Sequence, residues 1–357
     1  MKTEVIVVGE DFESSDIQKE GLKRAGRIIR QGGLVAFPTE TVYGLGGDAL
    51  NPESAGRIYA AKGRPSDNPL IVHIAKLEDI DRIVTQMPES ARKLAQTFWP
   101  GPLTMILPKS DLVPGEVTGG LDTVAVRFPS HRTARALIEA AGGYVAAPSA
   151  NLSGKPSPTL AKYVREDMDG RIEMIIDGGD IPIGLESTIV DCTVEPPMIL
   201  RPGFITTEML AGVLGQIAQD QTMMHGDTKE RPKAPGMKYR HYAPKGEMTI
   251  YTGERQRVAD TICKKAEEAL LHQIKTGIIA TDETIKQYQE QIPQAVIKSA
   301  GTCADEQTIA HNLYQILREF DDEEVQVIFS EAFAADGIGQ AIMNRLLKAA
   351  GHHVETV

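Results

Sequence analysis

The sequence predicts an α/β protein of two domains, a twisted mixed sheet with helices followed by a small Rossmann-like parallel α/β domain. Three observations predict this fold class. The chain has 357 residues, which is more than one hydrophobic core usually serves. Short strands rich in Val and Ile outnumber the helices between them up to about residue 210. After residue 247, strand and helix patterns alternate, as they do in parallel sheets with right-handed crossovers.

The expected first domain covers residues 1–211. It opens with a short apolar strand in MKTEVIVVGE, and GLKRAGRIIRQGG follows as a helix because its apolar residues recur at helical spacing before two glycines. LVAFPT predicts a buried strand that runs into a proline turn. Further helices are expected in PESAGRIYAAKG and ESARKLAQTFW, and further strands in PLIVHIA, LTMILPK, TVAVRFP, YVAAPSA, EMIIDGG and STIVDCT.

Residues 212–246 have no hydrophobic period and contain several Pro and Gly, which predicts a linker. GMKYRHYAP within it concentrates basic and aromatic residues.

The last region, residues 247–357, predicts the Rossmann-like domain. Its expected strands and helices alternate as MTIYTG, 254–273, TGIIAT, 282–291, AVIKSAG, DEQTIAHNLYQILREFD, VQVIFSEAF and GIGQAIMNRLLKAAG.

Composition excludes several classes of protein. The net charge of −11 argues against a large nonspecific nucleic-acid surface, so any anion site must concentrate Lys and Arg locally. No apolar run approaches the roughly 18 residues of a membrane span. Cys192, Cys263 and Cys303 are widely spaced, and we expect reduced core thiols in a cytoplasmic protein.

Two nucleotide-binding motifs occur only in part. GLGGDA (44–49) fits a dinucleotide fingerprint, but PTETVY separates it from the preceding strand and no helix pattern begins at its glycines. LSGKPS resembles a Walker fragment, but Ser149 stands where the first glycine belongs and Pro156 interrupts the lysine–hydroxyl step. Neither segment predicts a phosphate-binding loop of its class.

Arginines beside prolines indicate an anion site. KGRPSDNPL (62–70) is a stiff basic loop, and we expect Arg64, Arg127 and Arg201 each to end an apolar strand. Each residue alone has an ordinary structural explanation, such as a surface ion pair. Ligands gather at strand ends in open α/β sheets, and Arg binds both phosphates and carboxylates in a bidentate manner. The set therefore predicts a site for a polyphosphate and a carboxylate.

Seven motifs in this order complete the pattern: PTETVYGLG, KGRPSDNPL, PGPLT, VAVRFP, PSANLSGKPSPT, ESTIVD and LRPG. Together they resemble the YrdC-like domain of the threonylcarbamoyl-AMP synthases. GMKYRHYAP and the small C-terminal domain resemble the long form of that family, and the resemblance covers residues 15–353. It implies a YrdC-like fold and the synthesis of L-threonylcarbamoyladenylate from L-threonine, bicarbonate or CO2, and ATP, with release of pyrophosphate. The product feeds the modification of the tRNA adenosine beside the anticodon by downstream transfer proteins.

The resemblance also implies a set of site residues. L-threonine would be held by Thr41, His73, Arg127, the backbone at Ala147, and Ser187. ATP would be held by Arg64, Asn68, Thr123, Ser149, Asn151, Ser157, Arg201, His241 and Tyr242. Lys62 and Arg64 would be catalytic through their charge on the triphosphate.

The chemistry needs no side-chain nucleophile, because the carbamate of threonine attacks the α-phosphorus itself. Two anions must be brought together, so we expect fixed positive charge and Mg²⁺, whose ligands the sequence leaves unknown. Carbamates lose CO2 in water, which favours a lid over the active site in residues 212–246 rather than a plain tether. A tRNA- or double-stranded-RNA-binding module without adenylation activity is the alternative, and a weak tRNA contact is compatible with either.

Overall fold

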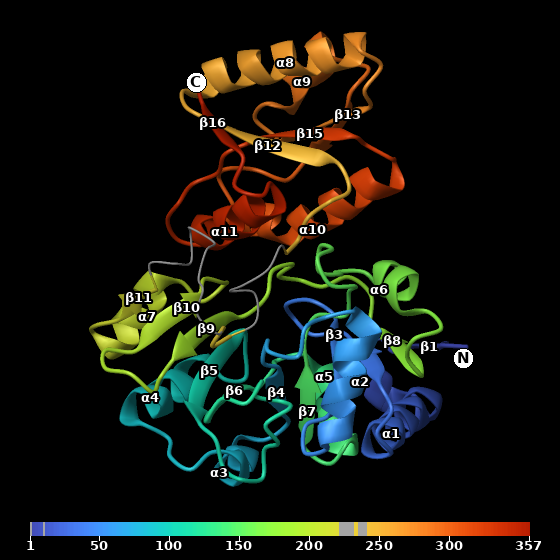
Figure 1. Ribbon diagram of the computed structural model, residues 1–357, viewed down its shortest axis with the longest axis vertical. Helices are drawn as coiled ribbons and strands as arrows, with labels where there is room; N and C mark the ends of the chain where they lie inside the picture. Colours follow the sequence, from blue (N-terminus) through green and yellow to red (C-terminus); the bar gives the residue numbers. More distant parts are fainter. Residues whose placement is uncertain (1, 10, 221–231, 235–240) are drawn as a thin grey trace. The chain divides into compact units, whose positions relative to one another are not determined.

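The computed structural model describes residues 2–9, 11–220, 232–234 and 241–357, which form two compact units (Figure 1). The described residues of the first unit fall within 1–153, 157–182 and 186–239. Those of the second fall within 154–156, 183–185 and 240–357. No described helix is long and apolar enough to cross a membrane.

The first unit contains an 11-stranded sheet of mixed direction, with the order β1-β8-β2-β3-β7-β4-β6-β5-β9-β10-β11. Parallel and antiparallel pairs both occur, which confirms the expected mixed sheet. Its strands are β1 (Glu4–Val7), β2 (Val35–Phe37), β3 (Gly44–Asp48), β4 (Ile71–Ile74), β5 (Leu103–Pro108), β6 (Thr123–Arg127), β7 (Tyr144–Ala147), β8 (Met174–Asp177), β9 (Thr188–Asp191), β10 (Met198–Arg201) and β11 (Ala218–Gln219).

Strands β3 and β11 were not expected from the sequence. GLGGD forms β3, which pairs antiparallel with β2, so the partial dinucleotide fingerprint is a strand rather than a turn before a helix. Glycine suits this strand at Gly46, because a Cβ there would lie 2.8 Å from Val145 Cγ1 and 2.9 Å from Phe37 Cε1. Short strand β11 and the end of α7 lie beyond residue 211, within the range expected for the linker.

Two helical layers cover this sheet, because successive side chains of a strand point to opposite faces. Val35 and Phe37 of β2 pack with α1 and α5 on one face, whereas Ala36 packs with the α2, α4 and α6 layer on the other. The helices are α1 (Asp16–Arg30), α2 (Pro52–Lys62), α3 (Ile80–Ile83), α4 (Glu89–Phe98), α5 (Arg132–Ala140), α6 (Ala161–Met168) and α7 (Thr207–Leu214). Helices α3, α5, α6 and α7 were not expected, so the first domain is more helical than the sequence indicated.

One area of the first face has a separate small core. Ile71 of β4, Ala125 of β6 and Ile106 of β5 form a cluster with the residues Ile189, Leu200 and Ala234. No residue of a described helix belongs to this cluster. Helices α1 and α5 therefore do not cover this part of the central strands.

The second unit is a parallel five-stranded sheet with the order β14-β13-β15-β12-β16, which confirms the expected Rossmann-like pattern. Helices α8 and α9 lie on one side of it, and α10 and α11 on the other (Figure 1). The elements are β12 (Glu247–Thr252), α8 (Arg255–Leu271), β13 (Thr276–Ala280), α9 (Ile285–Gln291), β14 (Val296–Ser299), α10 (Glu306–Asp322), β15 (Val327–Glu331), α11 (Gly339–Ala349) and β16 (Val354–Thr356). Only the exposed strand β16 was not expected.

The three cysteines are free thiols. Cys192 and Cys263 are buried, but Cys303 is exposed. The expectation of three core thiols is therefore wrong for Cys303, which follows the edge strand β14.

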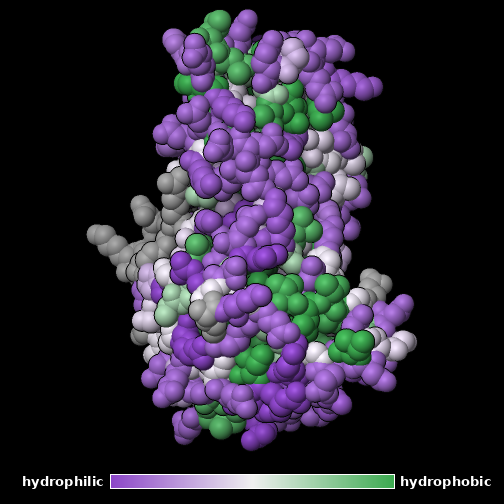
Figure 2. Space-filling model, turned by 90° about the vertical axis from the view of Figure 1, so that its right-hand side faces the viewer, coloured by the Kyte–Doolittle hydropathy of each residue, from purple (hydrophilic) through white to green (hydrophobic). Residues whose placement is uncertain are grey.

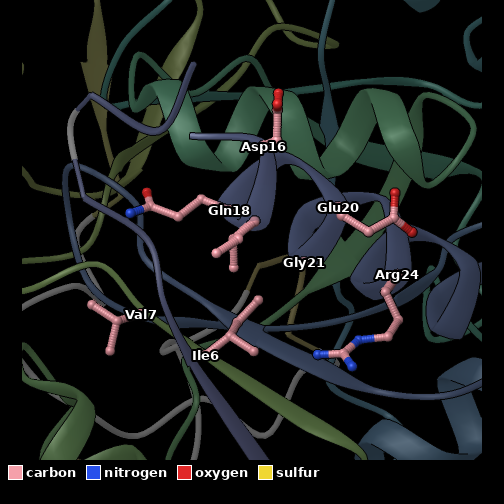
Figure 3. A pocket seen from close by; sticks show the side chains of 8 residues that line it. Ile6, Val7, Asp16, Gln18, Glu20, Gly21 and Arg24 are labelled. Carbon is pink, nitrogen blue, oxygen red and sulfur yellow. The ribbon is translucent and has the colours of Figure 1, made fainter. Parts of the chain in front are cut away.

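An open groove of roughly 630 Å³ lies between the edge strand β1 and helix α1, and residues such as Ile6, Gly21 and Arg24 line it (Figure 3). Val7 and Ile17 beside it are exposed, and Figure 2 shows apolar surface on this side of the first unit. None of the residues lining the groove is a predicted site residue.

Two helical glycines provide a test of the packing between α1 and α5. A Cβ at Gly26 of α1 would lie 2.5 Å from the backbone of Ala140 at the end of α5, whereas a Cβ at Gly56 of α2 would meet nothing within 4 Å. Ala is favoured over Gly in a helix interior by up to about 1 kcal/mol. We expect Gly56→Ala to raise the free energy of unfolding and Gly26→Ala to lower it, measured by urea denaturation. An equal gain from both substitutions would contradict the close α1–α5 contact.

Candidate active site

Strands β4 and β6 bring His73 and Arg127 side by side. The two strands are parallel, and His73 pairs in register with Arg127. Thr104 of β5 is the partner of Arg127 on its other side. Paired residues of neighbouring strands point to the same face, so these polar side chains lie on the face that carries Ile71 and Ala125.

Arg127 is a buried cation, with 4% of its surface exposed. Its Nη1 donates to Thr41 Oγ1 at 2.8 Å, and its Nη2 lies 2.7 Å from Glu40 Oε1. Its Nε has no hydrogen-bond acceptor among the described residues. A buried guanidinium with an unused N–H can bind a carboxylate, which is the role expected for it.

His73 is neutral in this environment. Burial and the neighbouring Arg127 charge lower its pKa to about 3. Nδ1 lies 3.1 Å from the carbonyl oxygen of Ile71, so Nδ1 carries the proton and Nε2 is left as an acceptor. The ring also lies edge-on to Phe37, with 6.2 Å between centroids.

Ser187 and Arg201 meet at the next strands of the sheet. Arg201, the last residue of β10, donates through Nε to the Ser187 carbonyl oxygen at 3.1 Å and through Nη2 to Ser187 Oγ at 3.2 Å. Ser187 Oγ is also 2.7 Å from Thr104 Oγ1. Thr104 thus links the Ser187 and Arg127 parts of the predicted site, because it pairs in register with Arg127.

Ser149, Asn151 and Ser157 lie in the loop that follows β7. Ser149 forms a bridge with Gly44, and its Oγ donates to Asn151 Oδ1. Ser157 Oγ donates to Glu186 Oε1 at 2.6 Å. Ala147, the last residue of β7, pairs with Ile71, so its backbone lies along the same strands as His73.

Lys62 does not project into a loop as expected. It is the last residue of α2, it is 3% exposed, and its Nζ donates to the carbonyl oxygens of Ser149 and Asn151, the latter at 2.6 Å. An ammonium group bound to these carbonyls stabilises the loop that carries Ser149 and Asn151. The structure thus gives Lys62 a role in holding this loop, and its direct contact with the triphosphate stays a prediction.

Arg64 does not end a strand, which corrects a second expectation. It follows the αL residue Gly63 after α2, and its Nη2 donates to the carbonyl oxygens of Asn68 and Pro69 at 3.2 and 3.1 Å. Asn68 is fully buried, and its side-chain amide has no hydrogen-bond partner among the described residues. Such an amide favours a ligand contact.

Thr123 begins β6, whereas Arg127 ends it. A strand rises about 3.3 Å per residue, so these two residues lie about 13 Å apart on the same face. Thr123, expected for ATP, thus lies at the start of β6, and Arg127, expected for threonine, at its end. The two sets are not separated throughout, because Arg201 contacts Ser187 near the Arg127 end and Ala147 pairs with Ile71 near the start of β4. That all of these residues form one site stays a prediction.

His241 and Tyr242 belong to the second unit. Tyr242 is buried and stacks against Tyr314 of α10, with 5.2 Å between ring centroids, and His241 lies 5.5 Å from its ring. Residues 236–240 of the expected lid motif lie outside the described residues. The ATP contact of His241 and Tyr242 therefore stays a prediction.

Comparison with known proteins gives a consistent result. Residues 27–203 match a family model described as "Telomere recombination", and residues 205–351 match one described as "Threonylcarbamoyl-AMP synthase, C-terminal domain". The threonylcarbamoyl-AMP synthase of Pyrococcus abyssi is 46% identical over 95% of this chain and 96% of its own length. That of Bacillus subtilis is 45% identical over 99% of both chains.

The chain belongs to the threonylcarbamoyl-AMP synthase family. A crystal structure of P. abyssi Sua5 complexed with L-threonine matches with a TM-score of 0.92 and 45% identity, over 99% of this chain and 100% of the other. These relatives cover 95–99% of the chain, so family membership applies to both of its units.

The structure adds four polar residues that the family-based set omitted: Thr39, Glu40, Thr104 and Glu186. All are buried. PTETVYG places Thr39 and Glu40 directly after a buried strand, and this sequence signal marks both as candidates although the family resemblance gives them no role. Thr104 and Glu186 lie within apolar or glycine-containing segments, and only pairing and side-chain contacts bring them to the site.

No metal site is evident among the described residues of this family member. No group of three His, Cys, Asp or Glu side chains there could hold a metal ion. The two buried carboxylates nearest the predicted contacts are engaged, Glu40 with Arg127 and Glu186 with Ser157. Those residues do not fit a protein-held Mg²⁺, so a metal ion would enter as part of the ATP substrate.

The lowered pKa of His73 predicts a pH effect on stability. The folded pKa is about 3 and the ordinary value is 6.5, so between these pH values the unfolded chain binds the extra proton. Stability contributed by this site is present above pH 6.5 and is lost as the pH falls toward 3. We expect the free energy of unfolding of wild type to fall more than that of His73→Gln between pH 7 and pH 5, measured by urea denaturation. Parallel pH profiles would contradict a neutral, buried His73.

Lys62 provides a second test. Hydrogen bonds from a charged donor contribute about 1.5–3 kcal/mol, so Lys62→Met should lower the free energy of unfolding by about that amount. Lys93→Met, on the exposed surface of α4, is the matched control, and we expect its effect to stay within about 0.5 kcal/mol. A stable Lys62→Met variant that has lost turnover would instead favour the direct triphosphate contact.

Proposed function

We propose that this chain synthesises L-threonylcarbamoyladenylate from L-threonine, bicarbonate or CO2, and ATP, with release of pyrophosphate. Full-length identity of about 45% to threonylcarbamoyl-AMP synthases carries this conclusion. The buried Arg127, with an unused Nε beside a neutral histidine, supports an amino-acid carboxylate as one ligand. The product serves the threonylcarbamoyl modification of tRNA, which supports a cytoplasmic location and transfer of the adenylate to downstream proteins.

The reaction has two bond-forming steps. The amine nitrogen of threonine attacks the carbon of CO2 or bicarbonate, which forms the N–C bond of a carbamate and releases a proton, and water in the case of bicarbonate. A carbamate oxygen then attacks the α-phosphorus of ATP, and the bond to the bridging oxygen breaks as pyrophosphate leaves. No side chain becomes covalently modified, so the residues act by positioning and by charge.

The residues fall into two groups in this proposal. Threonine is bound by the group formed by Thr41, His73, Arg127, Ala147 and Ser187, in which Arg127 takes the carboxylate. ATP is bound by the group formed by Arg64, Asn68, Thr123, Ser149, Asn151, Ser157 and Arg201. Mg²⁺ comes with the triphosphate. The buried positions and unused polar atoms of Arg127 and Asn68 support this division.

Pyrophosphate release tests the proposed function. We expect release from ATP only when threonine and bicarbonate are added together, because the carbamate is the attacking group. Tight, salt-sensitive binding of tRNA or double-stranded RNA without pyrophosphate release under any combination would favour the RNA-binding alternative.

Arg64→Ala tests the basic loop. We expect turnover to fall by at least about 100-fold, since charge-assisted contacts to a phosphate lie among the strong polar interactions, while circular dichroism shows a folded chain. Arg92→Ala, on the exposed face of α4, is the matched control and should retain wild-type turnover. An unaffected rate for Arg64→Ala would exclude the loop from the mechanism.

A further inference from the structure

Glu40 lies in the turn between β2 and β3, directly beside the predicted threonine subsite. It is 6% exposed, and its Oε1 is 2.7 Å from Arg127 Nη2. Burial disfavours its charge, but the Arg127 guanidinium outweighs this and lowers the pKa of the Glu40 carboxyl. Glu40 is therefore a carboxylate at neutral pH, which makes it a poor base for the substrate ammonium group.

The other terminal nitrogen of Arg127, Nη1, begins a chain of hydrogen bonds through Thr41 and Thr39. The donor and the acceptor of each bond in this chain can be deduced. Thr39 Oγ1 donates its single proton to the Val42 carbonyl oxygen at 2.7 Å. Thr39 Oγ1 therefore accepts from Thr41 Oγ1, which lies 2.9 Å away, and Thr41 Oγ1 in turn accepts from Arg127 Nη1. The proton of Thr41 is thus already used, and its hydroxyl can only accept a further hydrogen bond.

These two contacts hold the guanidinium from both terminal nitrogens. Glu40 forms an ion pair with Nη2, Thr41 Oγ1 accepts a hydrogen bond from Nη1, and neither Nε nor Nη2 has a hydrogen-bond acceptor among the described residues. A guanidinium is planar, so fixing two of its nitrogens also fixes the direction of the third. The free N–H then points in one direction before any ligand binds.

We propose that Glu40 is a positioning residue, which orients Arg127 to bind the carboxylate of the amino-acid substrate. The proposal rests on the proposed function, since it assigns Arg127 to threonine. It also assigns two groups of the amino acid to two neighbouring residues. Arg127 takes the carboxylate, and the accept-only hydroxyl of Thr41 takes an N–H or O–H of the amino acid.

Glu40→Gln tests the proposal, because it keeps the shape of the side chain and removes its charge. Without the carboxylate, the guanidinium is free to rotate and gives up part of a charge-assisted contact. We expect the KM for threonine to rise by about 10- to 100-fold, with kcat and the KM for ATP changed by less than about 3-fold. Isothermal titration calorimetry with threonine alone should show the same loss of affinity.

Glu331→Gln is the matched control for the loss of a buried carboxylate. Glu331 is 8% exposed and accepts a hydrogen bond from Tyr288 at 2.8 Å in the second unit, which contains none of the predicted threonine contacts. We expect it to lower the melting temperature without raising the KM for threonine. A Glu40→Gln variant that loses stability but keeps the wild-type threonine KM, or that raises both KM values equally, would overturn the positioning role.

A double-variant cycle shows whether Glu40 acts through Arg127. In an Arg127→Lys background the guanidinium is absent, so adding Glu40→Gln should change threonine affinity by less than about 2-fold. Full additivity of the two effects would overturn the proposal. A wild-type chain that binds threonine but releases no pyrophosphate would overturn the proposed function alone, and calorimetry would still test Glu40. A wild type that binds no threonine would overturn both.

Discussion

The buried charge of Arg127 is the constraint on which the candidate site depends. An unpaired guanidinium in a protein interior costs several kcal/mol, so a fold that buries one must supply partners. Glu40 and Thr41 supply them from the turn between β2 and β3. Thr41 and Arg127 are 86 residues apart in the sequence. This pairing connects the end of β6 to that turn and sets the conformation of both. It also leaves the Nε–H of the guanidinium without an acceptor among the described residues, and this N–H can bind the proposed carboxylate.

The charge of Arg127 is balanced locally, whereas the cation Arg64 lies toward the other end of β4. Arg127 and burial keep His73 neutral, and the Glu40 carboxylate balances Arg127, so this part of the site has little net charge of its own. Arg64 lies after α2 and contacts the chain just before β4 begins. A nearly neutral group of residues at one end and a cation at the other are in keeping with the proposed amino acid and polyphosphate, which differ greatly in charge. Local placement of cations thus reconciles an anion site with a net charge of −11.

Local patterns predicted the fold class, because the alternation in the second domain and the Val- and Ile-rich strands of the first are properties of short segments. They did not predict β3, since GLGGD has the composition of a turn, and its glycines are explained only by Val145 and Phe37 packed against them. The role of Lys62 was also beyond local reading. Its carbonyl partners lie 87 and 89 residues away in the sequence, and only the tertiary structure brings them to its ammonium group.

Ala125 shows why the site extends across strands rather than along one edge of the sheet. It lies between Thr123 and Arg127 on the same face of β6, and it pairs with Ile71, two residues before His73. The side chains of Ala125 and Ile71 form the sheet surface here, and no described helix contributes to their cluster. A ligand that reached from the Thr123 end to the Arg127 end would pass the methyl side chain of Ala125, where a larger side chain would obstruct it. The proposed adenylate joins an amino acid to a nucleotide, and a separation of about 13 Å between Thr123 and Arg127 is in keeping with a molecule extended along these strands.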